Sequence, residues 1–271
     1  MNFSLSSERF FSLCDKVHYK CFEFTRTSQH YRRLITLGRL PRPHYALGVF
    51  LSAYLAHELS VKKIAILEFG CWQGEALFDL ERFASDVESI IDIEIEIEIY
   101  GFEGGKGLPE SSDYKDRLYQ FSPGEMKTGS GNYFDQLRRA KIFFGEFNKS
   151  VFEFMNCDHA PIGCIFNDAD YFSSTLDSLE VLKDAKSLMP KIYLYFDDLN
   201  FSSSFTGELG AINTFNQLNE LKIETIPELA EYLSLYWNKW IVLGKRFFMV
   251  HNFNHKDYNR RYRNALLEPN I

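Results

Sequence analysis

The chain has 271 residues, 45% of them hydrophobic and 25% charged, and its formal net charge is −7. An acidic chain of this kind is not expected to present a surface for nucleic acid. Its five cysteines show no CxxC spacing, which favours reduced thiols over a zinc site or a disulfide framework. We therefore expect one large domain in a soluble, cytoplasmic protein, without a signal peptide or a membrane span.

The N-terminal segment, residues 1–43, is aromatic and unevenly charged, and we expect it to form a helical arm or lid beside a domain at 44–271. Between Glu23 and Glu58 there are five arginines, within residues 26–42, and no acidic residue. Two interpretations stay open for this stretch. It is a solvated helix face, or it is a basic lid that meets an anionic acceptor through a phosphate or uronate group.

From Pro43 onward, apolar runs alternate with helical patterns. The predicted strands are residues 64–67, 92–100, 142–144, 162–166, 192–196 and 247–250. The predicted helices are residues 43–58, a helix from Gly74 to about 84, and residues 149–155, 175–188 and 208–221. This order predicts a mostly parallel, doubly wound α/β sheet with helices on both faces. The Ile–Glu alternation of residues 92–100 predicts a strand whose glutamates face solvent.

Carboxylates follow the fourth and fifth predicted strands. Asp168 and Asp170 come after the fourth, and Asp197 and Asp198 come after the fifth. The carboxyl ends of parallel strands are where open α/β sheets bind ligands. Carboxylates gathered there repel one another unless a cation lies between them, and oxygen ligands favour Mg²⁺, Ca²⁺ or Mn²⁺ over zinc. The pattern therefore predicts a divalent-cation site.

A glycine turn follows the first predicted strand and carries Glu68, Gly70 and Gly74. Glycines allow a tight turn and a close approach of the backbone to a ligand. The spacing differs from the dinucleotide fingerprint GxGxxG, and the lysine of a phosphate-binding P-loop is absent. The second predicted strand then ends at Glu103, where a carboxylate would be placed to hold the hydroxyls of a ribose.

Taken in order, these motifs resemble class I S-adenosylmethionine (SAM)-dependent methyltransferases. More closely, they resemble the metal-dependent sugar O-methyltransferases related to macrocin O-methyltransferase and a family of uncharacterised bacterial proteins of that type. The resemblance covers about residues 43–253 and continues in the segments 101–109, 144–147, 168–175 and 196–198. It implies a Rossmann-like class I methyltransferase fold with SAM and Mg²⁺ as cofactors.

The resemblance implies a role for each matching residue. The methionine end of SAM, the ribose and the adenine would be bound by Glu68, Gly70, Cys71, Trp72, Gly74, Glu103, Glu146 and Phe147. The Mg²⁺ ligands would be Asp168, Asp197 and Asp198. The bulky Cys71 and Trp72 depart from the small residues that are usual in this turn.

Methyl transfer to oxygen requires an acceptor hydroxyl in line with the S–CH₃ bond and a group that removes its proton. A cation chelated by a diol helps with both requirements, so we expect a sugar or glycosylated metabolite as the acceptor. The candidate bases are Asp168 and, after the last strand, His251 or His255. We expect Asp170 to cap the helix that follows it, although it is also a candidate to face the substrate.

Other functions stay open at this point. Asp168 and Asp170 would suit the donor phosphates of a metal-dependent nucleotide-sugar glycosyltransferase, but the glycine turn and Glu103 would then have no role. Asp168 as the nucleophile of a haloacid-dehalogenase-type phosphatase is disfavoured because several strands precede it. An inactive methyltransferase-like protein and assembly into a homo-oligomer are not excluded.

Overall fold

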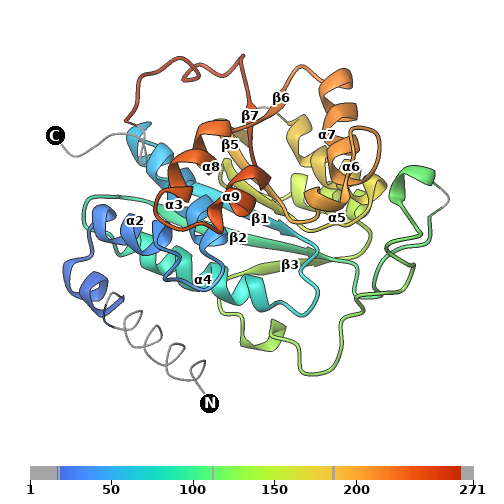
Figure 1. Cartoon of the computed structure of the whole chain (residues 1–271), viewed down its shortest axis with the longest axis horizontal. Helices are drawn as coiled ribbons and strands as arrows, with labels where there is room; N and C mark the ends of the chain where they lie inside the picture. Colours follow the sequence, from blue (N-terminus) through green and yellow to red (C-terminus); the bar gives the residue numbers. More distant parts are fainter. Residues whose placement is uncertain (1–16, 18, 112, 185–186, 264–271) are drawn as a thin grey trace.

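The computed structural model describes residues 17, 19–111, 113–184 and 187–263. Within these residues, one sheet of seven strands has the order β3-β2-β1-β4-β5-β7-β6 (Figure 1). β7 is antiparallel to both of its neighbours, and the other pairs are parallel. The strands are β1 Lys63–Phe69, β2 Glu96–Glu103, β3 Lys141–Phe144, β4 Ile162–Asn167, β5 Leu188–Phe196, β6 Lys222–Thr225 and β7 Phe247–His251.

Helices cover both faces of the sheet, so the predicted Rossmann-like doubly wound α/β class is confirmed (Figure 1). One layer contains α2 Ser28–Thr36, α3 Pro43–Glu58 and α4 Glu75–Glu88, with α8 Pro227–Ser234 and α9 Trp240–Leu243 beside them. The other layer contains α5 Phe147–Met155, α6 Phe172–Leu179 and α7 Gly207–Leu218. None of the helices in the described residues is long and apolar enough to span a bilayer.

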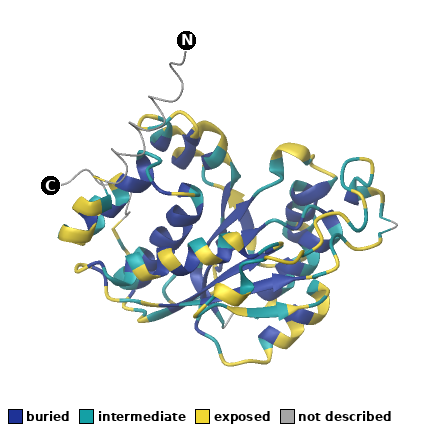
Figure 2. Cartoon of the chain, turned by 90° about the horizontal axis from the view of Figure 1, so that it is seen from below, coloured by how far each residue is buried: buried dark blue, intermediate teal, exposed yellow. Residues whose placement is uncertain are grey.

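α3 is the most buried helix of its layer, because it is apolar all round and is covered by other elements on several sides. It packs on β1, β4 and β5, and α2 and α4 pack against it. Gly48 makes the close approach possible, since a Cβ there would lie 2.7 Å from the Phe166 ring. In Figure 2 the central strands and the inward surfaces of the helices are buried, while exposed residues lie on the outer turns.

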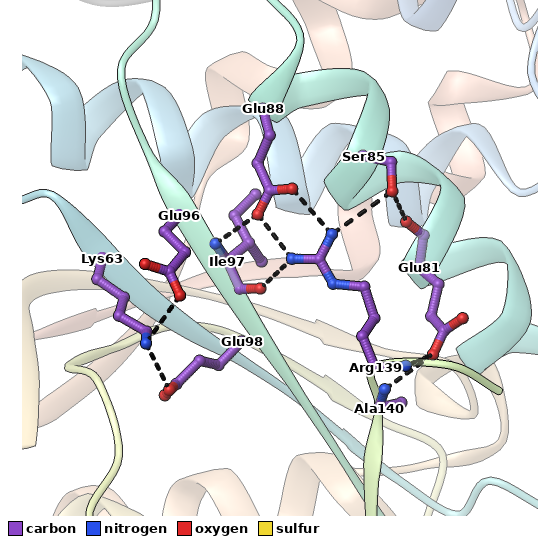
Figure 3. Close-up of polar contacts among 9 residues, drawn as sticks. All are labelled: Lys63, Glu81, Ser85, Glu88, Glu96, Ile97, Glu98, Arg139 and Ala140. Atoms are coloured by element: carbon purple, nitrogen blue, oxygen red, sulfur yellow. Dashed lines mark hydrogen bonds and ion pairs between the residues drawn. The ribbon is translucent and has the colours of Figure 1, made fainter.

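The segment in which Ile and Glu alternate, residues 92–100, forms β2 from Glu96 onward. The strand therefore begins four residues later than predicted. Ile97 and Ile99 are buried, and Glu96 is exposed. Lys63 of β1 pairs with Glu96 (2.8 Å) and with Glu98 (3.0 Å), as Figure 3 shows. The prediction that the glutamates of this strand face solvent is confirmed for Glu96, whereas Glu98 is partly buried and accepts the Ala160 backbone N–H (2.8 Å).

A long connection between β2 and β3, residues 104–140 and called the insertion below, is anchored where it returns to the sheet. The Glu81 carboxylate of α4 accepts backbone N–H groups of residues 138–140 at 2.7–2.8 Å. The Arg139 guanidinium donates to Glu88 at 2.8 and 2.6 Å and to a carbonyl of β2 (Figure 3). This network sets where β3 begins.

The described part of the N-terminal arm packs into the α3 layer. The Ser28 backbone N–H donates to Asp92 (2.9 Å), in the segment just before β2. At the other end of α2, the Trp240 indole N–H donates to the Thr36 carbonyl (3.0 Å). Because Asp92 precedes β2, the start of α2 lies near the amino ends of the parallel strands. Residues 1–16 of the predicted arm lie outside the described residues.

Candidate functional site

A cavity of about 1060 Å³ lies at the carboxyl ends of β1, β2, β4 and β5. The glycine turn and the segments after β3, β4 and β5 line it, and the insertion after β2 forms a further wall. The predicted site residues that line it are Gly70, Trp72, Glu103, Glu146, Phe147, Asp168, Asp197 and Asp198. The predicted residues that do not line it are Glu68, Cys71, Gly74 and His251. The volume is at the upper end of the range for small-molecule sites.

Gly70 is required by the packing of two strand ends. It has a φ of +83°, and a Cβ at this position would lie 1.9 Å from the Asp168 carbonyl oxygen. The Asp168 backbone N–H also donates to the Phe69 carbonyl (2.9 Å). Any side chain at Gly70 would therefore push the β1 turn away from the end of β4. A larger residue there would disturb the fold itself, so it cannot probe ligand binding selectively.

Glu68 and Cys71 lie beneath the glycine turn. Glu68 is 2% exposed and accepts a hydrogen bond from the Tyr45 hydroxyl (2.9 Å). Burial raises the pKa of Glu68 to about 7. The Cys71 thiol is buried and donates to the carbonyls of Glu68 and Phe102. These two residues therefore support the turn from below. Gly74 is covered by the Phe134 ring of the insertion, which a Cβ would approach to 2.8 Å.

Glu103 joins the glycine turn to the end of β2 and faces the cavity. Its carboxylate accepts the backbone N–H of Trp72 (2.7 Å) and the backbone N–H of Gly105 (2.7 Å). The Thr128 hydroxyl of the insertion lies at 3.4 Å. Burial raises the pKa of Glu103, and the two backbone donors oppose that rise. The carboxylate is thus held in one orientation at the cavity wall, beside the half-exposed Trp72.

Three carboxylates converge at the other end of the cavity. Single oxygens of Asp168, Asp170 and Asp198 all lie within 4.8 Å of one another. Burial raises the pKa of Asp168, and the charges of Asp197 and Asp198 raise it further. An all-oxygen donor set at this separation fits Mg²⁺, Mn²⁺ or Ca²⁺, which would remove the repulsion. We call Asp168, Asp170 and Asp198 the carboxylate triad.

The triad differs from the predicted metal set by one residue, because it includes Asp170 and not Asp197. The Asp197 carboxylate is instead paired with the Arg246 guanidinium (2.8 Å). The Tyr195 hydroxyl also donates to it (3.1 Å). Arg246 immediately precedes β7, and no local pattern in the sequence predicts that it meets a residue after β5.

Asp170 is free to join the triad because another residue caps α6. Asp116 of the insertion accepts the backbone N–H of Ser173 (2.7 Å) and the Ser173 hydroxyl (2.8 Å). Asp116 is fully buried. Asp170 itself has a φ of +57°, which turns the chain sharply before the helix. The expectation that Asp170 caps this helix is therefore wrong.

His251 and His255 do not lie at the cavity. His251 pairs in register with Lys191, near the start of β5, whereas the triad follows the end of β5. At about 3.3 Å per residue, the separation along the strand is about 20 Å. The Tyr258 hydroxyl lies 2.6 Å from His251 Nδ1. His255 follows β7 on the same edge, so neither histidine can act as the predicted base.

The predicted basic lid is also not formed by the described residues. None of the described residues before Pro43 lines the cavity. Arg42 pairs with Glu75 and Asp79 in the first turns of α4, both at 2.5 Å. The cavity itself is lined by eight carboxylate side chains and three lysines. This charge disfavours the anionic acceptor that the arginines suggested.

Three further polar residues beside the site were not expected from the sequence, namely Asp116, Glu208 and Arg246. Asp116 and Glu208 are fully buried. Glu208 lies in the first turn of α7, where an acid is ordinarily explained by the helix dipole. Asp116 and Arg246 reach the site from distant parts of the chain, and Glu208 reaches it through the connection from β5 to α7, so no local signal identifies them.

The known proteins similar to this chain are found among solved structures. No protein-family model matches the sequence, and no curated protein matches it significantly. Among solved structures, the O-methyltransferase NovP is 13% identical, covers 77% of this chain and 79% of its own, and has a TM-score of 0.49. CalS11, a calicheamicin methyltransferase, is 17% identical over 76% of this chain and 89% of its own, with a TM-score of 0.45.

A third similar structure is the O-methyltransferase TomG from Streptomyces achromogenes, involved in tomaymycin synthesis and solved in complex with SAM. It is 13% identical over 78% of this chain and 79% of its own, with a TM-score of 0.39. At such identities and TM-scores, these structures assign neither a ligand nor a reaction to this chain.

Proposed function

We propose that the protein is a SAM-dependent O-methyltransferase that uses a divalent cation, with Mg²⁺ as the expected ion. The observation that carries the proposal is one continuous cavity with two different polar ends. At one end, Glu103 is fixed beside the glycine turn. At the other end lies the carboxylate triad. A cofactor and a cation-bound acceptor would meet between these ends.

Glu103 would bind the ribose of SAM. Each carboxylate oxygen already accepts one backbone N–H. A carboxylate oxygen can accept more than one hydrogen bond, so both oxygens keep capacity for ribose hydroxyls. Phe147 and Glu146, after β3, line the cavity next to this end and are the candidates to contact adenine. Trp72 and Gly70 would contact the methionine part, while Glu68 and Cys71 support the turn.

The carboxylate triad would hold the cation, which lowers the pKa of a bound acceptor hydroxyl. Asp168 and Asp198 come from the ends of neighbouring strands, so a rigid sheet sets their spacing. Arg246 would hold Asp197 beside the triad. Because both candidate histidines lie at the opposite edge of the sheet, the proton of the acceptor would pass to a carboxylate of the cavity, with Asp168 as the candidate.

A sugar-like polyol without negative charge is the acceptor class that fits this site best. Neighbouring hydroxyls can chelate a cation held by the triad. The excess of carboxylates over lysines along the cavity would repel a phosphate or uronate that is not itself bound to the cation. We therefore propose a hydroxyl of a sugar or glycosylated metabolite as the site of methylation.

The test is isothermal titration calorimetry of the purified protein with SAM, and separately with UDP-glucose plus Mn²⁺. We expect saturable SAM binding and no binding of the nucleotide sugar. Glu103→Ala should weaken SAM binding about tenfold or more, since each lost hydrogen bond to a charged group contributes about 1.5–3 kcal/mol. The exposed Glu94, which pairs with Lys62 near the amino ends of the strands, provides a matched control as Glu94→Ala.

Binding of UDP-glucose with Mn²⁺ and no binding of SAM would replace this proposal with the glycosyltransferase alternative. If SAM binds and Glu103→Ala binds it equally well, the ribose assignment is wrong although the cofactor is right.

A further inference from the structure

Glu208 is a buried carboxylate beside the triad with no role so far. It lies in the first turn of α7 and is 0% exposed. Its Oε2 accepts the backbone N–H of Asp198 (2.9 Å). The chain after Asp198 makes a short 3-10 turn, Leu199–Phe201, and then returns through Gly207 to α7. Tertiary folding thus brings Glu208 back against the residue that ends β5.

The second oxygen of Glu208 has no hydrogen-bond partner among the described residues, and it is inaccessible to solvent. Leaving a buried polar atom unpaired costs about 1–3 kcal/mol, and more for a charged group. The charged side chains that act on Glu208 most strongly are all acidic: Asp168, Asp170, Asp197 and Asp198. The nearby Arg246 is already paired with Asp197. The fold therefore places an additional acceptor next to the triad without a donor for it.

A ligand with donors or positive charge would resolve this arrangement, and a hydrated divalent cation has both. Mg²⁺ characteristically keeps several of its waters when it binds to a few carboxylates. Glu208 does not belong to the group of oxygens within 4.8 Å, which are those of the triad. It is therefore placed to act on the site through the backbone of Asp198 and through the charge of its carboxylate.

We propose that Glu208 is a positioning residue of the cation site, which orients Asp198 through its backbone N–H and adds the negative charge of its carboxylate beside the cation. This inference rests on the cation of the proposed function. Residues that support metal ligands in this way typically change metal affinity by about 10–100-fold when they are replaced.

Glu208→Gln tests the charge of Glu208 separately from the contact with Asp198. A glutamine keeps the size of the side chain, and its carbonyl oxygen can still accept the Asp198 N–H, but its amide carries no negative charge. The measurement is titration of the protein with Mn²⁺ alone, followed by electron paramagnetic resonance of the free ion. We expect the Kd for Mn²⁺ to rise about tenfold or more, while SAM affinity measured by calorimetry stays within about twofold.

Glu81→Gln is a matched control, because Glu81 is also a buried carboxylate that accepts backbone N–H groups, and it lies in α4 away from the triad. It should lower thermal stability and leave the Kd for Mn²⁺ unchanged. If circular dichroism shows that Glu208→Gln does not fold, Glu208→Met, which is close in volume and apolar, takes its place with the same expected loss of Mn²⁺ affinity.

An unchanged Kd for Mn²⁺ in the folded variant overturns the inference and leaves Glu208 as a hydrogen-bond partner of the backbone only. If the wild-type protein binds no Mn²⁺, the inference falls together with the cation of the proposed function. SAM binding by calorimetry then decides separately whether the rest of that function stands.

Discussion

Glu68 has a different role in the structure from the one its motif suggests. The acid at the end of β1 was expected to bind the cofactor, yet its carboxyl group points to Tyr45 of α3 and is buried. Its second oxygen has no partner among the described residues. Desolvation is therefore the main influence on this group, and it raises the pKa of Glu68 to about 7. A raised pKa at a buried acid links folding stability to pH.

We expect Glu68 to make the protein less stable as the pH rises from about 4.5 to about 7. In this window the unfolded chain releases the proton of Glu68 while the folded state keeps it, so the free energy of unfolding falls with pH. The difference from the ordinary value of 4.5 corresponds to about 3 kcal/mol. Glu68→Gln should therefore be more stable than the wild type at about pH 8, by up to about 3 kcal/mol, and similar to it at about pH 4.

Urea unfolding at several pH values measures this effect. Glu94→Gln is a suitable control, because this exposed residue should leave the pH dependence in that window nearly unchanged. A Glu68→Gln variant whose stability follows the wild-type curve between these pH values would show that Glu68 is ionised in the folded protein.

At the scale of elements, the insertion determines the shape of the site more than its sequence suggests. Its Asp116 caps α6, and its Phe121 carbonyl accepts the Tyr171 hydroxyl (3.0 Å). The same segment covers the glycine turn through Phe134 and lines the cavity. The insertion thus connects the two ends of the cavity.

Asp116→Ala should lower the free energy of unfolding by about 2 kcal/mol, because it removes a helix cap and leaves buried donors unpaired. Asp113→Ala is the matched control, since Asp113 caps only the short 3-10 helix Tyr114–Asp116 through the Lys115 N–H (2.9 Å). Chemical denaturation of both variants measures the difference. Equal effects of the two substitutions would contradict the role given to Asp116.

One boundary error has a clear physical cause. The predicted helix 175–188 ends early, because α6 stops at Leu179 and β5 already begins at Leu188. Pro190 predicts the end of this helix and a strand that begins only after the proline, but Pro190 lies within β5. The pairing of β4 with β5 shifts register between Ile162 and Cys164, next to this proline. An irregular start of a strand tolerates the missing N–H of proline.

At the scale of the whole molecule, the described part of the N-terminal arm belongs to the core. Tyr31 and Ile35 are 0% exposed, and Leu34 is 2% exposed. Deleting residues 1–42 should therefore yield a protein without fixed tertiary structure, as near-ultraviolet circular dichroism and limited proteolysis would show. This expectation differs from that of a removable lid, for which the truncated protein would keep SAM affinity and lose only methylation.

Two point variants of the full-length chain test whether buried side chains of the arm stabilise the fold. Tyr31→Ala should cost about 3–5 kcal/mol, as is typical of buried aromatic residues. Phe24→Ala, at a ring that is 91% exposed, should change stability by less than about 0.5 kcal/mol. Retention of wild-type stability by Tyr31→Ala would restore the lid interpretation.

The sequence by itself determined the α/β class, the position of the glycine turn after the first strand, and the two strands that end in acidic residues. Apolar runs, glycines and strand-end acids are local signals, and parallel strands bring such ends to one edge. Only the tertiary structure decided which acids converge. Asp197 pairs with Arg246. Asp170 joins the triad, because Asp116 caps α6 in its place. Glu208 of α7 accepts the backbone N–H of Asp198. The contacts of Asp197 and Asp116 join residues far apart in the chain, and all three contacts depend on packing that no local pattern encodes.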